Sequence, residues 1–159
     1  MFSRITTLQE KKFAGKKIKM SFSQNKTIEL WQSFMPLSKE IQNVIGSELY
    51  SIEVYDKFFF NNFDSNNEFE KWAAIEVKGF DELTANFESI ILPTGLYAVF
   101  LHKGAASEAL KTYEYIFKTW LPKSNFILDD RPHLAVMDEK YKKDDLNSEE
   151  EIWIPIKRS

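Results

Sequence analysis

The sequence of 159 residues contains no cysteine, which excludes a disulfide scaffold, a thiolate metal site and a cysteine nucleophile. No segment approaches the roughly 18 apolar residues of a membrane-spanning helix, and the N-terminus lacks the apolar core of a secretory signal. With two histidines and no thiolate, a metal site would depend on carboxylates, and we expect neither a metal nor a cofactor. These absences predict a cytoplasmic protein without a membrane contact.

The chain also lacks the signatures of the common nucleotide-binding and hydrolase classes. There is no glycine-rich phosphate loop and no nucleophile elbow. A net charge of −3 offers no electrostatic reason to bind nucleic acid directly. No Pro/Gly/Ser-rich linker divides the chain, so residues 1–159 are expected to form one domain. What is abundant is aromatic: fourteen Phe, six Tyr and four Trp must line a core or a pocket.

The second half of the chain repeats the organisation of the first. A strand-like run, GKKIKMSF, leads into a helix-like run that stops at Pro36, and GLYAVFLH leads likewise into a helix that stops at Pro122. Each half closes on a strand that ends in lysine, EKWAAIEVK and EEIWIPIK. A β-α-β-β order that occurs twice predicts an α+β fold with helices on one face of an antiparallel sheet. We therefore expect two pseudo-symmetric βαββ units, about residues 1–80 and 90–159, with a ligand groove between them.

Periodicity predicts the individual elements. We expect strands at 49–55, 72–78, 95–102, 132–138 and 152–156, helices at 25–45 and 106–121, and a long strand at 4–20. Glycine inside a strand pattern indicates a break, here near Gly15, and Pro36 should kink or split the first helix. Residues 79–90 read as a polar connector and residues 142–151 as an acidic loop.

Side-chain alternation in the two closing strands separates an apolar face from an unusual one. In the last strand three isoleucines share one face, and the other face carries Glu151, Trp153 and Pro155. In its counterpart the apolar face alternates with Trp72, Ala74 and Glu76. Helices are expected on the apolar faces. Tryptophans with carboxylates on the opposite face make that face the candidate site, and alignment on the closing lysines sets Trp72 opposite Glu151.

The residue types indicate what such a site could do. An indole face attracts cations and stacks on planar ligands. A carboxylate beside it could neutralise a cationic ligand or, if desolvation raises its pKa, act as a general base. We predict a ligand-binding set of Glu151, Trp72, Trp153, Glu76 and Tyr97. The alternative is that Glu151 is a solvated strand-end residue and Trp72 an ordinary core residue.

Several motifs together resemble the GyrI-like effector-binding family, small-molecule domains that are also fused to DNA-binding helices in AraC- and MerR-type regulators. These motifs are GLYAVFLHKG, the helix ending YIFKTWLP, DRPHLAVMD, KKFAGKKIKM, KWAAIEV and, above all, EEIWIPIK. The resemblance covers nearly the whole chain. It implies a pair of SH2-like βαββ units that bind hydrophobic, often planar or cationic compounds with aromatics and a glutamate matched by Glu151.

The resemblance leaves three functions open. The first is a stand-alone bacterial protein that captures a hydrophobic, planar or cationic compound, without a helix-turn-helix of its own. The second is a hydrolase that opens cyclopropane-bearing DNA-alkylating compounds, with Glu151 and Trp72 as the catalytic pair. The third is a protein-interaction module that inhibits a DNA-handling enzyme, for which the acidic segment 144–151 is the sequence support. The ligand and the oligomeric state are not predicted.

Overall fold

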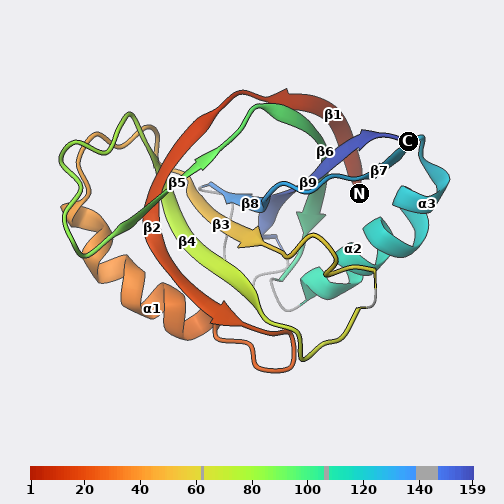
Figure 1. Cartoon of the computed structure of the whole chain (residues 1–159), viewed down its shortest axis with the longest axis horizontal. Helices are drawn as coiled ribbons and strands as arrows, with labels where there is room; N and C mark the ends of the chain where they lie inside the picture. Colours follow the sequence, from red (N-terminus) through yellow and green to blue (C-terminus); the bar gives the residue numbers. More distant parts are fainter. Residues whose placement is uncertain (62, 106–107, 139–146) are drawn as a thin grey trace.

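A curved antiparallel sheet organises the chain (Figure 1). The computed structural model describes residues 1–159 apart from 62, 106–107 and 139–146. The strand order is β1-β6-β9-β8-β3-β4-β2-β5, with β7 paired to β9 outside this order. The strands are β1 (Phe2–Leu8), β2 (Lys11–Met20), β3 (Leu49–Val54), β4 (Phe69–Val77), β5 (Glu88–Leu92), β6 (Gly95–Lys103), β7 (Phe126–Leu128), β8 (His133–Met137) and β9 (Glu149–Arg158). The predicted α+β class with an antiparallel sheet is confirmed.

The helices pack on the face that alternation assigned to them. Helix α1 (Thr27–Leu37) buries Leu30 and Phe34 against the Ala73–Val77 side of β4. On the other half of the sheet, Ile116 of the second helical segment packs on the isoleucines of β9. Figure 1 shows both helical segments outside the curve of the sheet. Among the described residues, no helix covers the opposite face of the sheet, which holds its own buried cluster of aromatic and aliphatic residues.

The predicted long strand at 4–20 is two strands, and its break is not at Gly15. The chain leaves β1 at Leu8 and enters β2 at Lys11, although β1 is the first strand of the sheet order and β2 is the second from its other end. Such a short link requires the sheet to curl until its two ends approach each other. Gly15 lies within β2, where a Cβ would overlap the carbonyl oxygen of Ala73 and lie 2.8 Å from Ala74 Cα. Glycine at this position allows the backbones of β2 and β4 to approach each other closely.

Two further expectations need correction, and one short strand was not expected. Pro36 lies in the last turn of α1, so it precedes the end of the helix rather than splitting it, and a short 3-10 turn η1 (Ser38–Glu40) follows. The connector 79–90 runs into an edge strand, β5, and β7 is a three-residue strand on the end of β9. Both strands are too short to give a periodic pattern, and their pairing with distant strands defines them.

The predicted helix at 106–121 is a continuous helical segment of three parts. It comprises α2 (Ala109–Tyr115), a π-helical turn η3 (Ile116–Trp120) and α3 (Leu121–Lys123). Among the described residues, no helix combines the length and apolarity that crossing a bilayer requires. Of the acidic segment 144–151, residues up to 146 lie outside the described part of the chain, whereas Glu149–Glu151 begin β9.

Candidate functional site

A single cross-strand row spans seven strands on the helix-free face. Each of its members is the direct antiparallel partner of the next, from β2 across the centre of the sheet to β1. In order, the row contains Lys17, Trp72, Ile52, Leu134, Trp153, Val99 and Arg4. The row begins and ends in a cation, carries a tryptophan next to or near each cation, and is aliphatic elsewhere.

Near the β1 end of this row, Arg4, Glu151 and Trp153 form one cluster. Arg4 Nη1 donates to Glu151 Oε2 at 3.1 Å, and the Trp153 indole N–H donates to Glu151 Oε1 at 3.1 Å. The guanidinium carbon of Arg4 lies 5.4 Å from the centre of the Trp153 ring. Both carboxylate oxygens of Glu151 are thus engaged, and a cation rests against the indole. We call these three residues the Arg4 cluster.

Near the β2 end of the row, Lys17, Glu70 and Trp72 repeat the arrangement. The Trp72 indole N–H donates to Glu70 Oε1 at 2.6 Å, and Lys17 Nζ lies 3.7 Å from Glu70 Oε2. The same ammonium lies 5.6 Å from the centre of the Trp72 ring. In both clusters the carboxylate precedes its tryptophan by two residues along the strand, which sets both side chains on one face. We call this second set the Lys17 cluster.

The two tryptophans differ in burial, and this decides which one a ligand could reach. Trp72 is 2% exposed and belongs to the buried cluster of the helix-free face together with Phe13, Tyr50 and Tyr97. Trp153 is only partly buried against that cluster. The side chains of Arg4 and Glu151 that border it are 45% and 35% exposed. The more accessible indole is therefore the one in the Arg4 cluster.

Glu151 and Trp72 share the helix-free face, but they are not neighbours. Glu151 lies opposite Val136, in the row next to that of the tryptophans and three strands away from β4. The carboxylate that contacts Trp72 is Glu70. In place of the predicted pairing of Trp72 with Glu151, the structure has two separate pairs, Glu151 with Trp153 and Glu70 with Trp72.

Tyr50 connects the two halves of this face. It pairs with Ala74 on one side and Val136 on the other, and is 7% exposed. Burial, with smaller contributions from surrounding carboxylates that include Glu76 and Glu151, raises the pKa of its hydroxyl well above the ordinary value, so it stays protonated.

Glu76, a predicted ligand residue, is paired with Lys11, whose Nζ lies 3.2 Å from Glu76 Oε2, and the Glu76 side chain is 12% exposed. Glu76 is therefore a paired charge at the margin of the buried cluster on the helix-free face.

Tyr97, also a predicted ligand residue, is fully buried and fixed by its own partners. Its hydroxyl donates to the carbonyl of Pro132 at 2.8 Å, and the guanidinium of Arg131 lies 4.7 Å from its ring centre. Burial raises the pKa of Tyr97 to about 12, against the opposing charge of Arg131. Its ring meets that of Trp153 edge-on at 5.8 Å. Tyr97 thus supports Trp153 from below and presents no free hydroxyl.

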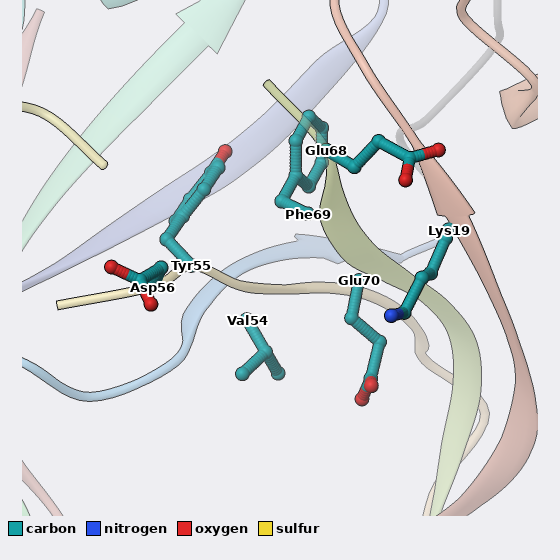
Figure 2. Close-up of a pocket in the computed structure, with 7 residues that line it drawn as sticks. All are labelled: Lys19, Val54, Tyr55, Asp56, Glu68, Phe69 and Glu70. Carbon is teal, nitrogen blue, oxygen red and sulfur yellow. The ribbon is translucent and has the colours of Figure 1, made fainter. Parts of the chain in front are cut away.

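A cavity of about 270 Å³ adjoins the Lys17 cluster (Figure 2). Glu70 pairs with Val54 and with Lys19 in the row next to Trp72, so these three lining residues lie on the helix-free face. Figure 2 shows Tyr55 and Asp56 on one side and Glu68 with Lys19 on the other. Three carboxylates against one ammonium give the cavity a negative balance, which favours a cation over an anion.

Sequence reasoning missed four residues of this face: Arg4, Lys17, Tyr50 and Glu70. One signal was available for Glu70, because the tripeptide pattern Glu-x-Trp occurs in both closing strands, at 70–72 and 151–153. Alignment on the closing lysines is offset by two residues from this pattern and conceals it. The two cations, Arg4 and Lys17, contact the indoles from strands that are far away in sequence, and no local pattern indicates these contacts.

The chain is similar to known proteins over nearly its whole length. The model of the GyrI-like small molecule binding domain matches residues 1–157. No curated protein is significantly similar in sequence.

Solved structures show the same fold. SAV2435 bound to tetraphenylphosphonium has a TM-score of 0.74 at 14% identity, covering 99% of this chain and 94% of that one. The EcmrR C-terminal domain has a TM-score of 0.74 at 16% identity, covering 100% and 99%. In an EcmrR–DNA complex, the match spans 57% of the EcmrR chain. A hydrolase encoded by lin2189 from Listeria innocua has a TM-score of 0.61 at 12% identity, covering 97% and 91%.

Proposed function

This chain belongs to the GyrI-like small molecule binding domain family, and on that premise we propose that it captures hydrophobic, planar or cationic compounds on the helix-free face of its sheet. The proposed contacts are Trp153 as the aromatic wall and Glu151 as the anionic group. Tyr97 supports the wall from the buried layer beneath, Trp72 belongs to the same buried cluster, and Glu76 contributes negative charge at the margin.

One observation carries this proposal: the site already holds a cation. The guanidinium of Arg4 contacts the indole of Trp153 and the carboxylate of Glu151 at the same time. A cation–π contact contributes about 0.5–1 kcal/mol at an exposed site and about 2 kcal/mol when it is desolvated. A structurally similar protein, SAV2435, was solved with tetraphenylphosphonium, which combines one positive charge with four aromatic rings. The same chemistry suits the Arg4 cluster.

We further propose that the two halves of the chain are the pseudo-symmetric units expected from the sequence. The strand order supports this. From the central β3–β8 pair outward, one side runs β3, β4, β2, β5 and the other runs β8, β9, β6, β1. Each side therefore places its closing strand second and the strand before its helix third. The helix-free face that both halves share is the proposed groove.

Isothermal titration with tetraphenylphosphonium tests the function. Wild type should bind, and Glu151→Gln should bind about three- to fivefold more weakly, because a partly exposed ion pair contributes up to about 1 kcal/mol. Affinity for the neutral analogue triphenylphosphine oxide should not change in this variant. Glu82→Gln, which removes an exposed carboxylate from the β4–β5 connection, is the matched charge control. Equal affinities of wild type and Glu151→Gln for the cation would reject the role of Glu151.

A hydrolase with Glu151 and Trp72 as the catalytic pair is the second candidate, favoured by the likeness to the lin2189 hydrolase. The geometry supports it less well. Trp153 and Arg4 each donate a hydrogen bond to one oxygen of Glu151, so both oxygens that would activate a water are already engaged. Mass spectrometry of a cyclopropane-bearing alkylator incubated with the protein separates the two functions. A water adduct formed over many turnovers identifies a hydrolase, and intact compound recovered from the complex identifies a binder.

The third function, an interaction module that inhibits a DNA-handling enzyme, has no support among the described residues beyond the acidic start of β9. Part of the acidic segment that suggested it, residues 144–146, lies outside the described part of the chain. A role as an effector domain remains a proposal that the likeness to the EcmrR C-terminal domain supports.

A further inference from the structure

The position of Arg4 depends on an irregularity in the edge strand β1. Phe2 pairs with Phe100 and Arg4 pairs with Val99, so Ser3 is an extra residue in this ladder. In a regular strand, Phe2 and Arg4 would share one face. The bulge instead turns Phe2 to the helical side, where it stacks on Trp120 at 5.2 Å, and leaves Arg4 on the helix-free side.

Arg4 reaches its partners across an intervening strand. Strand β6 lies between β1 and β9, and its residue in the shared row is Val99, which is fully buried. The short side chain of Val99 leaves room for the guanidinium to extend over it to Trp153 and Glu151. Because Arg4 comes from a strand edge with one hydrogen-bonded neighbour and is 45% exposed, it can move away without unpacking the core.

We propose that Arg4 is a specificity-determining residue: it occupies the cation position of the Trp153–Glu151 site and excludes small cations. This inference rests on the proposed function. A tethered group competes at an effective concentration of about millimolar or more. A free guanidinium or small ammonium offers the same contacts as Arg4 and gains nothing by replacing it. A large aromatic cation also covers the apolar surface around Trp153, so it gains burial energy that Arg4 cannot supply.

The Lys17 cluster provides the matched control. Lys17 carries the same charge, lies on the same face, and contacts a carboxylate and an indole in the same manner. The indole of Trp72 is a member of the buried cluster of this face, whereas Trp153 is only partly buried against it, so we expect removal of Lys17 to expose less aromatic surface than removal of Arg4. Arg4→Ala and Lys17→Ala therefore make the same change in net charge, but only Arg4→Ala uncovers an accessible tryptophan.

The experiment measures the affinities of two probes, ethylguanidinium and tetraphenylphosphonium, for wild type, Arg4→Ala and Lys17→Ala by isothermal titration. We expect ethylguanidinium to bind Arg4→Ala at least about tenfold more tightly than wild type, and tetraphenylphosphonium to gain about threefold. Lys17→Ala should change either affinity by less than about twofold, the scale of a screened surface charge. Arg4→Lys, which keeps the charge without the planar fork, should fall between wild type and Arg4→Ala and serves if Arg4→Ala is unstable.

Three results would overturn the proposal. Equal gains in Arg4→Ala and Lys17→Ala would show a general charge effect. A gain for tetraphenylphosphonium as large as that for ethylguanidinium would remove the size selection. Unchanged or weaker binding of ethylguanidinium in Arg4→Ala would show that Arg4 does not compete. If wild type and all variants fail to bind tetraphenylphosphonium, the proposed function itself is wrong, and the inference built on it falls with it.

Discussion

Arg4 and Lys17 lie at opposite ends of one cross-strand row, and each rests on an indole whose N–H is bonded to a glutamate two residues earlier in its strand. The two cations come from β1 and β2, which are joined by two residues but lie far apart in the sheet order. Curling of the sheet brings these strands to flank the same face. The fold thus places a cationic side chain of this protein against each of the two indoles.

Trp72 and Trp153 should differ sharply in their contributions to stability. Trp72→Ala should lower the free energy of unfolding by about 3–5 kcal/mol, as expected for a large buried ring. Trp153→Ala should cost about 1–2 kcal/mol, because its ring is only partly buried. Urea denaturation followed by circular dichroism measures both. Similar losses in the two variants would contradict the assignment of Trp72 to the core and Trp153 to the surface.

Gly15 should be intolerant of any side chain. Its replacement by alanine sets a Cβ against the backbone of Ala73 and Ala74, which neighbouring strands hold in place, so the strands must separate. We expect a loss of about 1–3 kcal/mol in the free energy of unfolding, typical of overpacking. Gly79→Ala is the control, since a Cβ there meets nothing within 4 Å. Wild-type stability of Gly15→Ala in urea denaturation would refute the close-approach role.

His133 should make the protein sensitive to acid. It is buried among Tyr55, Phe60 and Phe117, and burial, with the nearby charge of Arg131, lowers its pKa to about 3 from an ordinary 6.5. Between these values the unfolded chain takes up a proton that the folded chain does not. Stability from this residue is therefore present above pH 6.5 and is lost as the pH falls towards 3, by about 3–5 kcal/mol in total.

The test compares wild type with His133→Phe, which keeps an aromatic ring without a titrating group. Free energies of unfolding are measured at pH 7.5 and 4.5. The wild type should lose more stability between these pH values than the variant, and the difference isolates His133 from other groups, such as Glu53, whose buried carboxyl has a raised pKa and acts in the opposite direction. Parallel pH profiles would show that His133 does not contribute.

Arg131 should tolerate no conservative replacement. Its guanidinium donates to the carbonyls of Leu96 and Ile156 and to Asp129, and it covers the ring of Tyr97. Arg131→Lys retains the charge but cannot serve these acceptors together, so we expect a loss of about 1–3 kcal/mol in the free energy of unfolding. Arg158→Lys, at an exposed arginine over Phe126, should change it by less than about 0.5 kcal/mol. Equal effects in thermal or urea denaturation would contradict the bridging role.

The sequence by itself determined the fold class, the face on which the helices pack and the face that carries tryptophan with glutamate. These follow from local periodicity, because alternation along a single strand assigns each side chain to one face. Glu151 and Trp153 belong together for the same reason. The family could also be recognised, because its motifs recur in order along the chain.

Only the tertiary structure decided which residues complete the site. The partners of the two indoles, Arg4 and Lys17, lie on other strands, and their register depends on a bulge at Ser3 and on the curl of the sheet. Burial likewise separates Trp72 from Trp153, although both sit in the same local pattern. Pairing register and burial are sums over contacts between distant segments, so local periodicity contains neither.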